Sequence, residues 1–320
     1  MRAIQVSEHG GPDVLELVEV PTPDPGQGQV LVDIAAAGLN YIDTYQRTGA
    51  YPIPTPFILG QEGAGTVRAL GSGVEELSVG DRVAWKGCLG SYAESVAIPA
   101  DEAVPVPDEV EDELAAAAML QGLTAQYLAT STYPVQPGDW VVVHAAAGGV
   151  GLLLTQIVKL RGGHVLATTS TGEKAALATS AGADRVVSYD DMLEAAKDVT
   201  DSRGVAAVYD GVGKSTFDAS LDALRIRGTL VLFGASSGPV PPIDPQRLNS
   251  GGGLYLTRPS LAHYTRDREE LMSRSDELFG WIADGSLRVE IGQRYPLAEA
   301  AQAHRNLEGR KTTAKSLLIP

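Results

Sequence analysis

The sequence contains 320 residues, of which 44% are hydrophobic and 20% charged, a composition typical of a globular protein large enough for two domains. Its formal net charge of −15 argues against nucleic acid as the main partner, because phosphate binding needs a basic face. No apolar run approaches the roughly 18–20 residues that cross a membrane, and the first residues do not resemble a signal peptide. Together with a single cysteine, Cys88, these features predict a cytoplasmic protein without an intrachain disulfide.

Residues 1–120 predict a mainly antiparallel, barrel-like β-domain, because many short β-rich runs alternate with turns rich in glycine and proline. The clearest strands and turns are expected at residues 30–36, 65–70 and 82–85, and at residues 21–28 and 71–73.

From about Gly122 the pattern changes to an alternation of strands and helices, which predicts a parallel sheet with helices on both faces. We expect strands at residues 140–145, 164–168, 185–188, 205–210, 228–234 and 254–257, and helices at residues 150–160, at 173–181 and after Lys214. After Pro259 the pattern predicts two helices and a last strand, at residues 267–284, 297–309 and 315–319.

The most informative segment is residues 138–159, GDWVVVHAAAGGVGLLLTQIVK, in which a β-branched strand leads through a small-residue turn into an apolar helix. Glycine at positions 148, 149 and 151 lets the backbone approach phosphate oxygens, and the first N–H groups of the helix face the anion. Ala146 replaces the first glycine of the usual G-x-G-x-x-G motif, which alanine tolerates if its φ stays negative. The segment therefore predicts a pyrophosphate site.

The residues after the second parallel strand predict a preference for NADPH over NADH. NAD-binding folds place an acidic residue there, which binds the ribose hydroxyls and would repel a 2′-phosphate. This chain has Ser170 and Thr171 instead, followed by Lys174, which would accept the phosphate. Glu173 lies further on and is expected to begin the next helix. The alternative for Lys174 is a solvated helix lysine.

Two N-terminal segments, AGLNYIDTY and LGQEGAGTV, resemble the region of medium-chain alcohol dehydrogenases that carries the catalytic zinc. In zinc-containing members of that superfamily these segments supply a Cys and a His, and the matching positions here are Asn40 and Gln61. Neutral amides are poor zinc ligands, and Glu62 alone does not make a site. A structural zinc lobe, with four closely spaced cysteines, is also missing. The sequence therefore predicts a zinc-free protein.

Along its whole length the chain resembles the zinc-independent quinone oxidoreductases, the zeta-crystallin family of the medium-chain dehydrogenase/reductase superfamily. The motifs that carry the resemblance, besides the glycine turn, are HGGPDVLELVEVPTPDPGQGQVLV, GLNYIDTYQRTGAYP, GSGVEELSVGDRV, QGLTAQYL, VYDGVG, LYLTRPSL and KSLLIP. The resemblance implies an α/β protein with a Rossmann NADPH-binding domain of doubly wound parallel sheet at residues 121–258. It also implies a GroES-like catalytic domain at residues 1–120 and 259–320, and a homodimer that pairs through the strand at residues 254–257.

The resemblance also implies which residues bind the cofactor. Asn40, Thr124 and the backbone around residues 233–237 would hold the nicotinamide end, and Tyr189 and Arg310 the adenosine end. Local alternatives are a turn role for Asn40, a helix cap for Thr124, and Arg305 or Lys311 in place of Arg310. The complete expected set is Asn40, Thr124, Gly148, Gly149, Val150, Gly151, Ser170, Thr171, Lys174, Tyr189, Gly211, Phe233, Gly234, Ser236, Ser237, Thr257, Arg258 and Arg310.

For catalysis, Tyr45 and Tyr51 are the best candidates to hydrogen-bond a substrate carbonyl oxygen and donate a proton, with Asn40 beside them. The alternative is that both rings only line an apolar pocket. Gln121 stands where some relatives carry lysine, so a charge-stabilising role there is in doubt. Three further residues are expected to be structural or inert, namely Asp43, His144 and Cys88.

These features predict an NADPH-dependent, zinc-free reductase of quinones. The first alternative is an NADPH-dependent reductase of α,β-unsaturated carbonyls, which uses the same geometry. An alternative of another class is a non-catalytic NADPH-binding protein.

Overall fold

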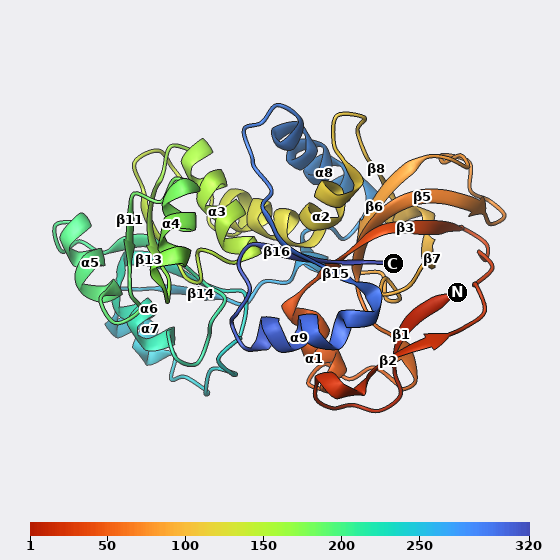
Figure 1. Ribbon diagram of the computed structural model, residues 1–320. Coiled ribbons are helices and arrows are strands. Elements are labelled where there is room, and N and C mark those ends of the chain that lie inside the picture. Colours follow the sequence, from red (N-terminus) through yellow and green to blue (C-terminus); the bar gives the residue numbers. More distant parts are fainter. The chain divides into compact units, whose positions relative to one another are not determined.

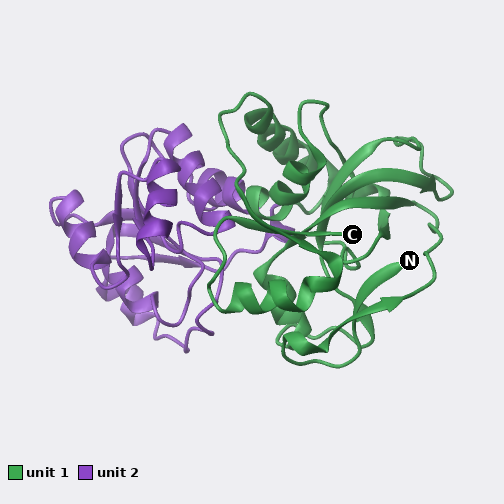
Figure 2. Cartoon of the chain, viewed as in Figure 1, with its two compact units in different colours: residues 1–123, 265–320 green, residues 124–264 purple.

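The computed structural model describes residues 1–320, and the chain divides into two compact units. Unit 1 consists of Met1–Leu123 and Thr265–Pro320, and unit 2 consists of Thr124–Tyr264 (Figure 2). No helix in the protein combines the length and the hydrophobicity needed to span a bilayer.

Unit 1 is built around a seven-stranded sheet in which the order β15-β16-β3-β5-β6-β8 forms a continuous path and β7 also pairs with β3. These strands are β3 (Gln29–Leu39), β5 (Glu62–Leu70), β6 (Arg82–Lys86), β7 (Ser95–Pro99), β8 (Val104–Pro105), β15 (Ile291–Pro296) and β16 (Lys315–Ile319). All pairs are antiparallel except β15 with β16. A smaller antiparallel sheet of order β2-β1-β4 comprises β1 (Arg2–Val6), β2 (Leu15–Glu19) and β4 (Phe57–Ile58).

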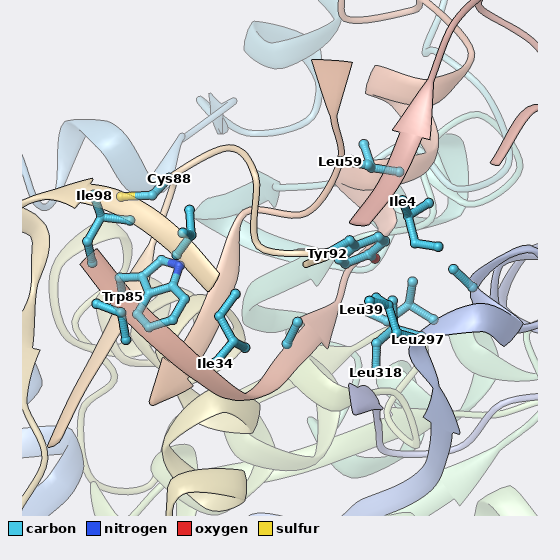
Figure 3. Close-up of a cluster of buried hydrophobic side chains, with 14 of the residues drawn as sticks. Ile4, Ile34, Leu39, Leu59, Trp85, Cys88, Tyr92, Ile98, Leu297 and Leu318 are labelled. Atoms are coloured by element: carbon cyan, nitrogen blue, oxygen red, sulfur yellow. The ribbon is translucent and has the colours of Figure 1, made fainter. Parts of the chain in front are cut away.

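The core of unit 1 lies between these sheets and the helices beside them, and Figure 3 shows its buried side chains, among them Ile4, Leu39, Trp85 and Tyr92. Trp85 is fully buried and its indole N–H donates to the Ser91 hydroxyl over 2.9 Å, which satisfies the ring's only polar group. The helices that begin in this unit are α1 (Tyr41–Arg47), α2 (Asp112–Tyr127), α8 (Arg268–Ala283) and α9 (Ala300–Glu308).

Unit 2 contains a six-stranded, wholly parallel sheet of order β11-β10-β9-β12-β13-β14. Its strands are β9 (Trp140–Val143), β10 (His164–Thr168), β11 (Arg185–Val187), β12 (Val205–Asp210), β13 (Leu224–Leu232) and β14 (Tyr255–Thr257). Helices α3 (Gly149–Leu160) and α4 (Gly172–Ser180) cover one face, and α5 (Met192–Val199), α6 (Phe217–Asp222) and α7 (Gln246–Ser250) the other (Figure 1). The strand order reverses between β9 and β12, which is where this type of sheet binds ligands.

The predicted fold class is confirmed by the parallel sheet of unit 2 and the mainly antiparallel sheet of unit 1, in which the C-terminal strand β16 pairs with β3. Four α-helices were not predicted, namely α1, α2, α5 and α7. In α2 the run Ala115–Ala118 is buried throughout, so the helix has no polar face and shows no amphipathic period. The other three are short, with seven residues in α1, eight in α5 and five in α7.

Candidate cofactor and active site

The glycine turn after β9 has the geometry of an anion site. Ala145 adopts the left-handed backbone conformation, with φ 51°, whereas Ala146 keeps a negative φ, as predicted. Gly148 is the N-cap of α3 and provides no side-chain cap for the first-turn N–H groups. A Cβ at Gly151 would lie 2.5 Å from the Ala145 carbonyl oxygen, so only glycine allows this close approach of turn and helix. The uncapped N–H groups and the dipole of α3 suit a pyrophosphate.

The segment after β10 carries hydroxyls and a lysine but no carboxylate at the strand end. Thr171 is the N-cap of α4 and its hydroxyl accepts from the Lys174 backbone N–H over 3.3 Å. Ser170 is exposed and Lys174 half-buried. Glu173 lies in the first turn of α4, as predicted. The structure therefore places a cationic side chain and a capped helix N-terminus at the end of the second strand.

Tyr189 follows β11, and its ring stacks on His144 at a centroid distance of 5.7 Å. The His144 ring nitrogens lie 2.8 Å from the Thr168 hydroxyl and 3.0 Å from the Ser220 hydroxyl. Burial lowers the pKa of His144, so the imidazole is neutral. The prediction of a satisfied core histidine is confirmed, and its ring supports Tyr189.

The loops after β12 and β13 interlock. Buried Asp210 accepts from the N–H groups of Val212 and Gly213 over 2.8 and 2.9 Å, which fixes the turn at Gly211. The Ser237 N–H donates to the Val212 carbonyl oxygen over 2.8 Å. A Cβ at Gly234 would lie 2.4 Å from the Gly211 carbonyl oxygen. Gly234 is therefore needed for the approach of these two loops, and a Cβ at Gly211 would lie 2.9 Å from the Phe233 ring.

With the exception of Thr124, the predicted cofactor residues of unit 2 lie along the carboxyl edge of the parallel sheet. They belong to the segments at the ends of its successive strands. Phe233 and Ser236 belong to the loop after β13, and Thr257 ends β14 with exposed Arg258 behind it. Thr124 lies in the last turn of α2 and is buried. In unit 1, Arg310 is exposed just after α9, with φ 56°.

Asn40 is buried in unit 1, and all four hydrogen-bonding positions of its side-chain amide are occupied. Nδ2 donates to a Glu62 carboxylate oxygen over 2.7 Å and to the Gly38 carbonyl oxygen over 3.2 Å. Oδ1 accepts from the Lys315 ammonium over 2.9 Å and from Gln121 Nε2 over 3.1 Å. Lys315 and Glu62 also form an ion pair of 2.5 Å.

A second buried network begins at Asp43, the third residue of α1. The Asn40 N–H and the Tyr92 hydroxyl each donate to Asp43 Oδ2 over 2.8 Å. Arg47 donates to His304 Nδ1 over 2.9 Å, and since arginine can only donate, the His304 proton resides on Nε2, which lies 3.4 Å from the Tyr92 oxygen. Burial raises the pKa of Asp43 to about 7 and lowers that of His304 to about 3. Asp43 is a structural residue, as predicted.

The two predicted catalytic tyrosines lie together. The Tyr45 and Tyr51 rings are 5.2 Å apart between centroids, and Tyr41 packs edge-on to Tyr45 at 5.5 Å. Tyr51 is 45% exposed and can be reached from solvent. Cys88 is buried, and burial raises its pKa to about 12, which agrees with an inert thiol.

Known proteins match the chain over its whole length. The family model of the alcohol dehydrogenase GroES-like domain matches residues 26–108, and that of zinc-binding dehydrogenase matches residues 149–273. A mycobacterial protein solved in complex with NADPH is 52% identical, with 100% of both chains covered and a TM-score of 0.97. Quinone oxidoreductase 1 of Escherichia coli is 45% identical over 99% of both chains. A 2-haloacrylate reductase of Burkholderia sp is 38% identical, over 99% of this chain and 98% of the relative.

The chain belongs to the quinone oxidoreductase family. The residues predicted to stand in place of the zinc ligands of related dehydrogenases are Asn40 and Gln61. The structure contains no group of three or more His, Cys, Asp or Glu side chains placed to hold a metal ion. The absence of zinc remains a prediction.

Sequence reasoning missed the charged residues that hold the catalytic candidates in place. Lys315 contacts Asn40 across 275 positions, and Arg47 contacts His304 across 257. Neither pair has a characteristic spacing, and the only local signal is a lysine at the head of the apolar strand KSLLI.

Proposed function

We propose that this member of the quinone oxidoreductase family catalyses the NADPH-dependent reduction of quinones. The observation that carries the proposal is the carboxyl edge of the parallel sheet, where an uncapped glycine turn is followed by a strand end without a carboxylate. When bound, NADPH supplies the hydride, and the protein has to position it and stabilise the negative charge that develops on the substrate oxygen.

The residues present fit this cofactor. The first turn of α3, at Gly149, Val150 and Gly151, offers N–H groups to the pyrophosphate, and the close approach at Gly151 excludes any side chain there. Lys174, with Ser170 and Thr171, would bind the 2′-phosphate. The capping hydrogen bond from Lys174 N–H to Thr171 occupies one lone pair of that hydroxyl and leaves its O–H as a donor.

Tyr189 and Arg310 are proposed to bind the adenosine end of the cofactor. The neutral His144 ring beneath Tyr189 gives it a fixed platform without introducing charge.

The nicotinamide end is proposed to bind at Asn40, Thr124, Gly211 and the segment from Phe233 to Ser237. Thr257 and Arg258, at the end of β14, complete the set. Because the four hydrogen-bonding positions of the Asn40 amide are filled within unit 1, a hydrogen bond from Asn40 to the cofactor would replace one of them.

Tyr45 and Tyr51 are proposed to hydrogen-bond the substrate oxygen and supply its proton. The two phenols pack against each other, one from α1 and one from the loop that follows it. The Asp43 carboxylate, by contrast, already accepts hydrogen bonds from Asn40 and Tyr92. Replacing each tyrosine by phenylalanine should lower kcat more than it changes the KM of NADPH if the phenol acts on the substrate.

The likeness to a 2-haloacrylate reductase favours one second function, the NADPH-dependent reduction of α,β-unsaturated carbonyls. Both reactions deliver a hydride to an acceptor conjugated with a carbonyl, so the same site serves either.

A steady-state assay with matched panels of quinones and enones, each with NADPH and NADH, tests the proposal. We expect turnover with quinones and higher kcat/KM with NADPH. Turnover of enones alone would assign the second function. Tight NADPH binding without turnover of either panel would indicate a binding protein.

We also propose a homodimer that pairs through β14, and residence in the cytoplasm. β14 is an edge strand of the six-stranded sheet, and Tyr255 on it and Ile226 on β13 are 60% and 73% exposed, large for apolar groups. Light scattering at micromolar concentration should give twice the mass of the chain, and a monomeric mass would contradict the dimer. Cell fractionation tests the compartment.

A further inference from the structure

A buried ion pair in unit 1 fixes the polarity of two neighbouring amides. Lys315 and Glu62 are 1% and 0% exposed, and the Glu62 carboxylate accepts from the Lys315 ammonium, from Asn40 Nδ2 and from the Leu120 N–H, the last over 2.5 Å. Gly38 makes room for the carboxylate, since a Cβ there would lie 2.1 Å from Glu62 Oε2. Each of the three donors, one of them an ammonium, therefore meets the Glu62 side chain as an acceptor.

This ion pair dictates the orientation of Asn40. An ammonium can only donate and a carboxylate can only accept, so the amide oxygen must face Lys315 and the amide nitrogen must face Glu62. The reverse orientation would set N–H against N–H and oxygen against oxygen. The Asn40 amide is therefore held in one of its two possible orientations.

Asn40 in turn orients Gln121 on α2. Because the Asn40 oxygen is an acceptor, Gln121 must approach it with Nε2, which it does at 3.1 Å. The Gln121 carbonyl oxygen Oε1 is the last polar atom of the chain of contacts that runs from the ion pair through Asn40 to Gln121. It is buried without any hydrogen-bond partner in the protein. An unpaired buried carbonyl costs free energy, and a ligand that supplied a donor would recover it.

We propose that the Glu62–Lys315 pair acts through Asn40 to present Gln121 Oε1 as a hydrogen-bond acceptor for the nicotinamide half of the bound cofactor. The inference rests on the proposed function, which places Asn40 at that end. The donor is an N–H of the carboxamide or a hydroxyl of the adjoining ribose. Gln121 is then a cofactor-binding residue, and Lys315 and Glu62 are positioning residues.

Binding measurements on Gln121→Met test the acceptor. Methionine keeps the length of the side chain and removes its hydrogen bonds, so we expect NADPH to bind about two- to twelvefold more weakly. Adenosine 2′,5′-bisphosphate, which lacks the nicotinamide half, should bind unchanged and thereby report an intact site. Gln302→Met, on the exposed face of α9, is the matched control and should leave both constants unchanged.

A reduced NADPH analogue with an acetyl group in place of the carboxamide separates the two donors. If the carboxamide N–H is the donor, the wild type loses affinity for this analogue and Gln121→Met loses no more. If the ribose hydroxyl is the donor, Gln121→Met weakens both compounds equally. An unchanged dissociation constant for NADPH in Gln121→Met overturns the inference, because an ordered water alone would then satisfy the oxygen. A wild type that does not bind NADPH rejects the proposed function, and the inference with it.

A double-mutant cycle tests the positioning role. In a Glu62→Gln/Lys315→Met background, which has no buried charge, the added change Gln121→Met should cost clearly less NADPH affinity than in the wild type. Lys315→Arg keeps a cationic donor and should retain most of the wild-type effect. Equal costs of Gln121→Met in all backgrounds would refute the orienting role of the ion pair. Thermal unfolding identifies a double variant that fails to fold. Glu62→Gln/Lys315→Gln, which keeps two neutral hydrogen-bonding side chains at these positions, then replaces it, and a cost of Gln121→Met equal to that in the wild type would again refute the orienting role.

Discussion

Asp43 makes the stability of unit 1 depend on pH in a direction opposite to that of an ordinary surface carboxylate. It is fully buried, and burial is the main reason that its pKa rises from 3.8 to about 7. The Asn40 N–H, the Tyr92 hydroxyl and Lys315 lower its pKa by smaller amounts, while Glu62 raises it. Asp43 Oδ1 has no hydrogen-bond partner in the protein, so part of the carboxylate's charge is uncompensated.

The sign follows from proton binding. Between pH 3.8 and about 7 the folded protein holds a proton on Asp43 that the unfolded chain has released, so unfolding loses a proton and stability falls as pH rises. The contribution is fully present below pH 3.8 and is gone above the folded pKa. At about 1.4 kcal/mol per pH unit the whole effect is about 4 kcal/mol, of which about 2–3 kcal/mol falls between pH 5 and pH 7.

Asp43→Asn is the perturbation that isolates this effect, because asparagine keeps the shape and an acceptor but does not titrate. Calorimetry at several pH values should show the wild type losing Tm relative to the variant by about 5–10 °C between pH 5 and pH 7. The lowered pKa values of His144 and His304 act in the opposite direction, but both proteins contain them and the comparison cancels them. Asp108→Asn, at an exposed position, should show no such trend. A wild-type-to-variant difference that does not change with pH would refute the reasoning.

Three further predictions follow from the cofactor site. Lys174→Ala should raise the KM for NADPH about ten- to a hundredfold and leave the KM for NADH and kcat nearly unchanged. The control Lys197→Ala, on α5, should leave both KM values unchanged. Equal losses with both cofactors would show that Lys174 supports the fold and does not bind the 2′-phosphate. Gly151→Ala should weaken NADPH binding at least tenfold, because its Cβ meets backbone at 2.5 Å, while Gly280→Ala, with nothing within 4 Å, should leave binding unchanged and raise Tm slightly. Elemental analysis of dialysed, active protein should find less than about 0.1 zinc per chain, and one zinc per chain with activity lost on chelation would contradict the zinc-free reading.

The sequence patterns predicted those parts of the fold that depend on local periodicity. The strands β10, β12 and β16 begin and end at the predicted residues, because each is a short, mostly apolar run with a glycine or proline at one boundary or both: Gly163 before β10, Gly204 and Gly211 around β12, and Pro320 after β16. The helix α2 was missed because its burial on all sides erases the period that marks a helix.

In the candidate site, too, the parts that are contiguous in the sequence could be predicted and the parts built from distant segments could not. The glycine turn and the Ser170–Lys174 segment each consist of consecutive residues, so their chemistry could be predicted from the local sequence. The environment of Asn40 could not, because Lys315, Glu62 and Gln121 come from three distant segments that only the sheet and α2 bring together. At Asn40 the pattern predicted only the replacement of a metal ligand, and the structure adds the ion pair that holds the amide.

The position of β16 has a consequence for how the protein is made. This strand lies between β15 and β3 inside the sheet of unit 1, and its first residue neutralises Glu62 from 253 positions away. Ribosomes add about 5–20 residues per second, so Glu62 is synthesised roughly 13–50 s before its partner. Unit 2 is continuous in sequence and can complete its sheet during that interval. The N-terminal part of unit 1 is thus translated first but completed last, and during that delay the Ala37–Leu39 end of β3 and the Glu62 carboxylate lack their partners.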